Sequence, residues 1–263
     1  MDAYEIYARI GEKKPLVHHI TNWVTIYDCA NMTRTFGALP VMAHAREEVE
    51  EMVGLAGALV LNIGTLTTEL VDTMILAGKA ANTRGIPVIL DAVGAGATKL
   101  RTISTQRILE NVKVSILKGN YGEIGVIAGS EAEVKGVESI SLEGDPVELA
   151  KSLSIALDNT VVMTGKRDIV AREDKALLID NGHDIMGTVV GTGCMAASVL
   201  GAFAAVEEDH AKAAAAALAC YGIIGELAAE GAVGPNSFKG NFYDSVGRLT
   251  KDIVDDKARI TEA

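Results

Sequence analysis

The stretch Gly191-Thr192-Gly193-Cys194 has the residue types of an anion-binding turn at the start of a helix. Two glycines one residue apart let backbone N–H groups turn inward, and the positive end of the helix dipole adds to the attraction for an anion. The apolar run at residues 195–200 predicts the helix that follows. Cys194 then places a nucleophilic or proton-accepting thiol beside the anion. The alternative is an ordinary glycine turn with Cys194 as a small core residue.

Two further polar clusters follow predicted strands and suit a phosphate group. Asp91 ends an apolar strand and is followed by a glycine-rich turn at residues 92–98. This arrangement suits a magnesium-associated carboxylate beside a phosphate, although Asp91 could also be a helix N-cap. Thr164 and Gly165 end another strand, with Asp168 close behind, and a hydroxyl and a glycine backbone are suitable phosphate contacts. A simple turn explains these residues equally well.

The segment Lys118-Gly119-Asn120 ends a third predicted strand, and Glu123 follows three residues later. Asn120 and Glu123 share one face of a starting helix and could together hold a hydrated cation such as Mg²⁺. Lys118 could offset the charge of nucleotide phosphates. The same spacing also predicts a capping box, in which Asn120 and Glu123 only stabilise the helix start.

These clusters must be positioned by the elements between them, and the pattern along the chain predicts an α/β fold. Apolar runs without polar alternation, separated by helical patterns, predict a mostly parallel sheet covered on both faces by helices, in one domain over residues 1–263. Ligands of such sheets bind beyond the carboxyl ends of the strands. We predict strands at 58–63, 86–90, 114–117 and 160–163, an antiparallel hairpin at 169–171 and 177–179, helices at 67–82, from 120 and at 146–157, and a mainly helical segment from 193 to about 253.

Composition narrows the function classes. With 24 Lys and Arg against 35 Asp and Glu, the net charge of −11 argues against binding to nucleic acid. No apolar run is long enough to span a membrane and the first residues do not resemble a secretory signal, so a cytoplasmic protein is expected. Three cysteines without CxxC spacing disfavour a disulfide framework or a zinc site. Neither a P-loop nor a GxGxxG dinucleotide motif is present.

Taken in order, the motifs resemble those of the hydroxyethylthiazole kinase family, a branch of the ribokinase-like superfamily. The resemblance runs through nearly the whole chain, and its strength lies in the order and spacing of eight motifs that are each weak alone. They are residues 18–22 (HHITN), 37–43 (GALPVMA), 62–66 (NIGTL), Asp91 with its glycine turn, 118–120 with Glu123, 164–165, 191–194 and 234–238 (GPNSF).

The resemblance implies transfer of the γ-phosphoryl group of ATP to the primary hydroxyl of 4-methyl-5-(2-hydroxyethyl)thiazole, with Mg²⁺, for thiamine diphosphate synthesis. It also implies a homotrimer with the substrate bound between subunits. The residues carried over by position are Met42, Asn22 and Gly191 for the thiazole alcohol, Lys118 and Thr164 for ATP, Asp91 and Glu123 for Mg²⁺, and Thr192, Gly193 and Cys194 for catalysis.

Cys194 stands where the superfamily usually has an aspartate base. A thiol has a reference pKa of about 8.5, which a helix N-terminus lowers, so some thiolate is expected at neutral pH. Because phosphoryl transfer needs alignment and charge neutralisation more than a base, we expect Cys194 to assist the reaction rather than dominate it. Two departures from the family pattern, Ala92 for proline and Leu39 for serine, affect the turn after Asp91 and the wall of the substrate pocket.

Other functions remain open at this level. A ribokinase-like kinase for another small alcohol, or the dehydratase of hydrated nicotinamide cofactors that shares the fold, would use a similar set of motifs. Residues 20–22 and 40–42 favour the thiazole alcohol over these substrates. A sensor that binds nucleotide or thiazole without catalysis is a further alternative, which the combined presence of metal, phosphate and acceptor residues disfavours.

Overall fold

The computed structural model describes residues 2–135 and 144–263, without the side chains of residues 130–135. In this part of the chain nine strands form one sheet in the order β2-β1-β3-β4-β5-β6-β7-β8-β9. The strands from β2 to β6 are parallel, and β7, β8 and β9 continue the sheet antiparallel. The bounds are β1 Leu16–Ile20, β2 Leu39–Val41, β3 Ala58–Asn62, β4 Val88–Asp91, β5 Ile116–Asn120, β6 Thr160–Thr164, β7 Asp168–Arg172, β8 Lys175–Ile179 and β9 Ile260–Glu262.

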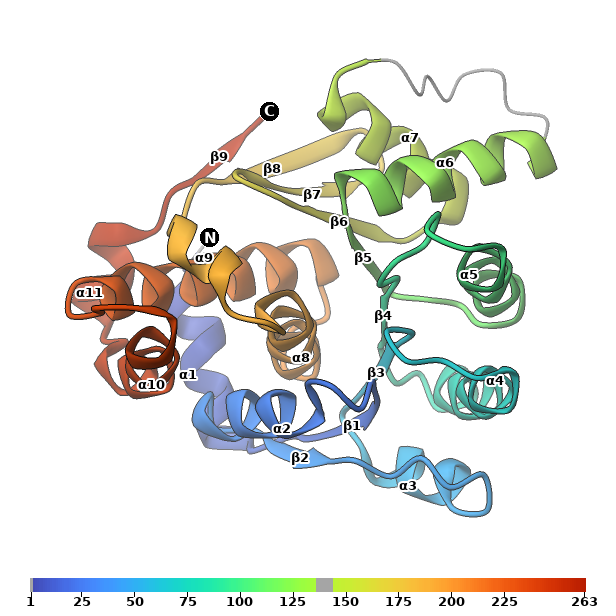
Figure 1. Ribbon diagram of the computed structural model, residues 1–263, viewed down its shortest axis with the longest axis horizontal. Coiled ribbons are helices and arrows are strands. Elements are labelled where there is room, and N and C mark those ends of the chain that lie inside the picture. Colours follow the sequence, from blue (N-terminus) through green and yellow to red (C-terminus); the bar gives the residue numbers. More distant parts are fainter. Residues whose placement is uncertain (1, 136–143) are drawn as a thin grey trace.

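Helices cover both faces of the sheet (Figure 1). On one face lie α1 (Ala3–Lys13), α2 (Ile26–Thr35), α8 (Thr192–Ala204), α9 (His210–Ala229), α10 (Pro235–Asp244) and α11 (Lys251–Lys257). On the other lie α3 (Val49–Leu55), α4 (Thr68–Thr83), α5 (Lys99–Asn111), α6 (Tyr121–Lys135) and α7 (Pro146–Leu157). Each face has its own buried apolar core, which explains why strand β3 is buried at every residue. The predicted α/β fold is confirmed.

Local sequence signals set several of these boundaries. Helix α7 begins where Pro146 follows the N-cap Asp145, whose carboxylate accepts a hydrogen bond from Val147 N at 2.9 Å. Helix α4 begins after Thr67, whose hydroxyl accepts from Leu70 N at 3.1 Å. The predicted helix at 146–157 is confirmed at both ends, and the hairpin predicted near 169–179 is β7 and β8.

Helix α9 is long and apolar enough to cross a membrane by length and composition alone. However, 83% of its most apolar window is buried inside the protein, against the sheet and the neighbouring helices. Its apolar character is therefore that of a central core helix. The alanine run at residues 213–217 lies inside it and is buried throughout, as expected for a closely packed helix.

The strand order reverses direction between β1 and β3. The chain leaves β1 through α2 to β2 on one side, then returns through α3 to β3 on the other side of β1. At such a switch point the connections diverge to opposite faces, which opens a crevice beyond the carboxyl ends of the strands. The residues that follow β1 and end β3, β4 and β5 all lie at this edge.

Candidate active site

Polar side chains from four neighbouring strand ends form one hydrogen-bonded chain at the crevice. Lys118 Nζ on β5 lies 2.9 Å from Asp91 Oδ1 on β4, and Asp91 Oδ2 accepts from Asn62 Nδ2 on β3 at 2.6 Å. Asn62 Oδ1 in turn accepts from Asn22 Nδ2, after β1, at 2.9 Å. Asn22 Nδ2 also lies 3.4 Å from Cys194 Sγ on α8. The structure thus brings four predicted site residues together through Asn62.

The ion pair between Lys118 and Asp91 is almost completely removed from water, since their side chains are 5% and 0% exposed. Burial raises the pKa of Asp91, while Lys118 and Asn62 oppose that shift. Burial lowers the pKa of Lys118, but the Asp91 carboxylate outweighs it, so that the pKa of Lys118 is raised. Lys118 is therefore a charged ammonium group at neutral pH, fixed in one position by its partner.

The N-terminus of α8 has the geometry expected of an anion site. Gly191 is the N-cap with φ at 95°, and a Cβ there would lie 2.5 Å from Thr25 Cγ2, so both conformation and space require glycine. The first intrahelical bond runs from Met195 N to Gly191 O at 2.8 Å. The N–H groups of residues 192–194 precede that bond and, in α-helix geometry, have no intrahelical partner. A Cβ on Gly193 would lie 3.3 Å from Lys118 Nζ, so the ammonium group is next to these donors.

The expected thiolate at Cys194 is not supported. Burial raises the pKa of the Cys194 thiol, and the nearby Asp91 carboxylate adds to the shift. Hydrogen bonding and Lys118 act in the opposite direction but do not reverse it. The low-dielectric site disfavours a second anion beside Asp91, so Cys194 is a neutral thiol at neutral pH.

Glu123 and Asn120 form the capping arrangement that the sequence left open. Glu123 N donates to Asn120 Oδ1 at 3.0 Å, and Asn120 N donates to Glu123 Oε2 at 2.7 Å. Glu123 Oε1 accepts in addition from Gly94 N at 2.7 Å, which ties the glycine turn after Asp91 to α6. The Glu123 carboxylate is part-exposed and lies close enough to Asp91 to raise the pKa of Asp91. It retains lone pairs for a further donor.

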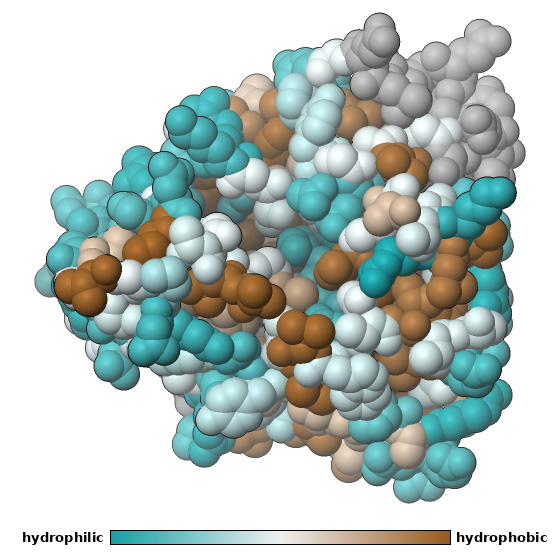
Figure 2. All heavy atoms as spheres, viewed as in Figure 1, coloured by the Kyte–Doolittle hydropathy of each residue, from teal (hydrophilic) through white to brown (hydrophobic). Residues whose placement is uncertain are grey.

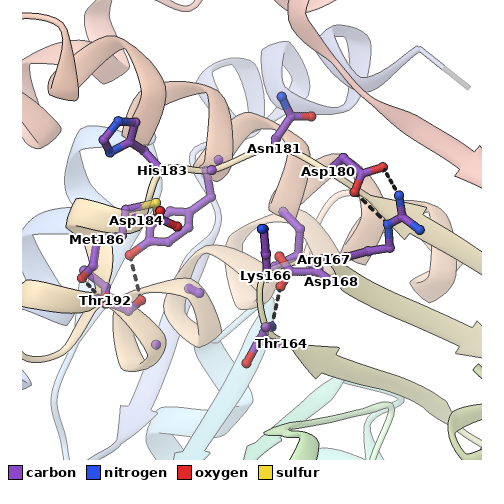
Figure 3. Close-up of a pocket in the computed structure, with 18 residues that line it drawn as sticks. Thr164, Lys166, Arg167, Asp168, Asp180, Asn181, His183, Asp184, Met186 and Thr192 are labelled. Atoms are coloured by element: carbon purple, nitrogen blue, oxygen red, sulfur yellow. Dashed lines mark hydrogen bonds and ion pairs between the residues drawn. The ribbon is translucent and has the colours of Figure 1, made fainter. Parts of the chain in front are cut away.

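A cavity of about 800 Å³ opens beside the α8 N-terminus. Thr192 and Gly193 line one side of it, and Thr164 and Gly165, at the end of β6, line another (Figure 3). Its remaining wall comes from the segment between β8 and α8 and from α9. Two of the predicted phosphate-contacting regions, far apart in sequence, therefore face the same cavity.

Asp168 also lines this cavity, at the first residue of β7. Its Oδ1 accepts from Gly165 N at 2.9 Å and fixes the turn between β6 and β7. Burial raises the pKa of Asp168 to about 6, although the Gly165 hydrogen bond and Lys118 lower it.

Of the three residues expected on the acceptor side, Gly191 caps α8 as described above, and Asn22 and Met42 differ in their surroundings. Asn22 is buried, and its Oδ1 accepts from both Thr25 N and Thr25 Oγ1 at 3.0 Å, so its side chain holds the start of α2 against the switch point. Met42 follows β2, is half-buried and packs against the core on the α8 face.

Sequence reasoning assigned no role to three residues that hold the site, although one of them, Asn62, begins the motif at residues 62–66. Asn62 links Asp91 to Asn22, as described above. Arg101 donates to the carbonyl oxygens of Ile63, Gly64 and Val93 at 2.8–3.0 Å and so joins the loops after β3 and β4. Tyr221 donates to Thr192 O at 2.7 Å and anchors the first turn of α8. Of the three, only Asn62 had a signal in the sequence, as a polar residue that ends an apolar strand and as the first residue of the motif at 62–66.

Comparison with known proteins gives a consistent result. Residues 7–252 match the family described as the hydroxyethylthiazole kinase family. The chain is 54% identical over 253 residues to a hydroxyethylthiazole kinase of Methanosarcina mazei, covering 96% of this chain and 97% of that protein. It is 56% identical over 245 residues to one of Methanosarcina acetivorans, covering 93% and 94%.

Solved structures extend the likeness to the fold. The structure of a hydroxyethylthiazole kinase protein from Pyrococcus horikoshii superposes with a TM-score of 0.92 at 40% identity, covering 99% of this chain and 98% of that one. A ribokinase-like superfamily protein from Enterococcus faecalis, at 13% identity and a TM-score of 0.66 over 90% of this chain and 87% of that one, shares the fold.

Proposed function

The chain belongs to the hydroxyethylthiazole kinase family and acts as a kinase on an alcohol group in thiamine biosynthesis, and on this premise we propose which of its residues carry the reaction. The donor is ATP and the acceptor is the primary hydroxyl of 4-methyl-5-(2-hydroxyethyl)thiazole. The bond between the γ-phosphorus and its bridging oxygen to ADP breaks while a bond to the alcohol oxygen forms. The hydroxyl proton passes to an oxygen of the transferred phosphoryl group.

One observation carries this proposal: the unbonded N–H groups at the start of α8 lie next to Lys118 Nζ and border a cavity large enough for a nucleotide. The residues in these roles are Thr192, Gly193 and Lys118, with Thr164 as the ATP contact across the cavity. Preorganised donors of this kind stabilise the charge on a transferring phosphoryl group, and alignment supplies most of the remaining rate enhancement.

Mg²⁺ would supply charge neutralisation on the β- and γ-phosphates. Among the described residues no group of three or more His, Cys, Asp or Glu side chains could hold a metal ion alone. This fits Mg²⁺, which keeps several waters and binds through one or two carboxylates together with substrate phosphates. Glu123, with lone pairs left, fits a contact to Mg²⁺-bound water. Asp91, whose two oxygens each accept one hydrogen bond, has lone pairs left and would contact the ion from its buried position beside Lys118.

On the acceptor side we propose that Gly191, Cys194, Asn22 and Met42 position the thiazole alcohol. The Cys194 thiol, neutral and held by Asn22, accepts a hydrogen bond from the substrate hydroxyl and orients its oxygen toward the γ-phosphorus. It does not remove the proton as a thiolate. This agrees with the modest role expected from a reaction that requires little base.

We further propose a homotrimer, located in the cytoplasm, with the acceptor site between subunits. The segment after β1 exposes three large apolar side chains, with Trp23 50%, Val24 67% and Tyr27 75% exposed. They flank Asn22 and Thr25 of the site, and further apolar patches on one face of the molecule appear in Figure 2. A second subunit covering this segment would remove its apolar surface from water and close the acceptor side. Light scattering of the purified protein tests the trimer.

The reaction is tested by mixing the purified protein with ATP, MgCl₂ and the thiazole alcohol and identifying the product by mass. Formation of ADP and the thiazole phosphate supports the proposal. Faster turnover of a pyrimidine alcohol or a sugar would assign the chain to another kinase activity of this fold. Binding of both ligands without ADP formation would assign it to a sensor.

A further inference from the structure

Charged side chains line the cavity beside the α8 N-terminus, and the proposed site gives several of them no role. Three carboxylates line it, Asp168, Asp180 and Asp184, and a nucleotide triphosphate brings further negative charge. Lys118 is buried behind Gly193 and already neutralises Asp91. Mg²⁺ would neutralise part of the phosphate charge, and a protein cation beside the phosphates farther from α8 would neutralise more of it. Lys166 and Arg167, directly after Thr164 and Gly165, are the lysine and arginine that line the cavity.

Arg167 is already oriented at the cavity by a bidentate ion pair. Its Nε donates to Asp180 Oδ1 at 2.7 Å and its Nη2 to Asp180 Oδ2 at 3.0 Å, across the gap between the β6–β7 turn and the end of β8 (Figure 3). The same planar fork of donors fits two oxygens of a phosphate group. The pair is solvent-accessible, with side chains 56% and 35% exposed, so exchanging the carboxylate for phosphate loses little.

The two partners differ in how firmly they are held. Asp180 N donates to Arg259 O at 3.0 Å, and the Arg259 side chain donates back to Asp180 O, so the backbone of Asp180 is fixed to the C-terminal segment. Arg167 sits on a three-residue turn that the Asp168–Gly165 hydrogen bond closes, and its long side chain extends from that turn. The arginine can therefore move while the carboxylate stays.

We propose that Arg167 is a phosphate-binding residue that exchanges Asp180 for the triphosphate of the nucleotide when ATP enters the cavity. Asp180 then has two effects: it orients the empty site and it competes with the nucleotide for the guanidinium group. The inference rests on the proposed function, because it places the triphosphate along Thr164 and Gly165.

The test uses variants whose effects have opposite signs. Arg167→Gln removes the phosphate contact, so KM for ATP rises about tenfold, with KM for the thiazole alcohol unchanged. Asp180→Asn removes the competitor but leaves the cation, so KM for ATP falls two- to fivefold. Calorimetric titration with ADP and with a non-hydrolysable ATP analogue, each with Mg²⁺, gives the tightest binding for Asp180→Asn, then the wild type, then Arg167→Gln. Arg172→Gln is the matched control, since Arg172 lies at the far end of β7, the strand that directly follows Arg167, also pairs with an aspartate, and lies outside this cavity.

If the ion pair only stabilises the fold, both variants break the same contact and KM for ATP shifts in the same direction in each. That result overturns the proposal, as does an Arg167→Gln variant with unchanged nucleotide affinity. Wild-type protein is assayed first for ADP formation with the thiazole alcohol. If it binds nucleotide but does not phosphorylate the alcohol, the proposed function fails while the calorimetric comparison still decides the role of Arg167.

Discussion

Removing the negative partner of the buried ion pair gives the sharpest test of the site. Asp91→Asn preserves the size of the side chain and its acceptor for Asn62, but it leaves the Lys118 ammonium group uncompensated. The two charged atoms are 2.9 Å apart and almost unexposed. Breaking such a pair from one side costs about 3–5 kcal/mol. For a chain of this size, about 2–4 °C in Tm corresponds to each kcal/mol, so Tm falls by about 6–20 °C.

The double variant Asp91→Asn with Lys118→Met separates stability from catalysis. Methionine keeps an apolar stem of similar length and removes the orphaned charge, so the double variant is more stable than Asp91→Asn alone. Both variants lose phosphoryl transfer, because Lys118 no longer lies, charged and fixed, beside the α8 N-terminus. Scanning calorimetry at pH 7 measures the stability, and ADP release measures the activity. A double variant no more stable than the single one would refute the claim that an uncompensated charge causes the loss.

Three further predictions concern the walls of the site. Asp168→Asn keeps the Gly165 contact and removes the charge. Because burial raises the pKa of Asp168 from 3.8 to about 6, its ionisation destabilises the wild-type protein as pH rises through this window. The free energy of unfolding of the variant, measured in urea, therefore exceeds that of the wild type by up to about 3 kcal/mol at pH 7 and by nothing below pH 4. Gly222→Ala places a Cβ 2.5 Å from the backbone of Asn181 and costs about 1–3 kcal/mol with weaker nucleotide binding, whereas Gly225→Ala meets only the flexible end of a methionine and costs less. Cys194→Asp retains activity, because a carboxyl group, protonated beside Asp91, still offers an oxygen that accepts from the alcohol. Cys194→Ser is slowed, because the shorter C–O bond holds the acceptor farther from the alcohol; ATP binding stays intact in both variants.

Each of these has a result that contradicts it. If the difference in unfolding free energy between the wild type and Asp168→Asn is the same at pH 4 and pH 7, the buried charge of Asp168 does not destabilise the protein. Equal stability of the two glycine variants would mean that the Asn181 segment shifts freely away from α9. Complete loss of turnover in Cys194→Ser, with nucleotide affinity preserved, would show that the thiol does more than orient the alcohol.

The sequence was sufficient to predict the central strands of the sheet and insufficient to predict the strands at its edges. The run at residues 58–61 is apolar throughout because helices cover both faces, and that signal survives without tertiary information. Strand β1 contains His18 and His19, both buried, and nothing local shows that their rings lie inside. Strands β2 and β9 have three residues each, too few for a pattern, and the polar helix α5 has little apolar periodicity.

In the candidate site, too, the sequence indicates some properties and not others. The positions of Asp91, Lys118 and Cys194 at element ends are local properties, and the sequence indicates them. Their ionisation states are not local. Lys118 is paired with Asp91, and Cys194 is a neutral thiol, because Lys118 is buried and Cys194 is partly buried beside a carboxylate that strand β4 supplies. A helix N-terminus read from sequence predicts a lowered thiol pKa, and only the folded arrangement shows that burial dominates.

The outermost strands of the sheet affect how the protein behaves in a crowded solution. Strands β2 and β9 lie at the two ends of the strand order and each spans only three residues. Pro40 in the middle of β2 has no N–H to offer, and Glu262 adds charge to β9. Short, charged or proline-containing borders give another chain little to pair with. A wide sheet with a strongly apolar interior can therefore stay dispersed at high concentration instead of growing into fibrils.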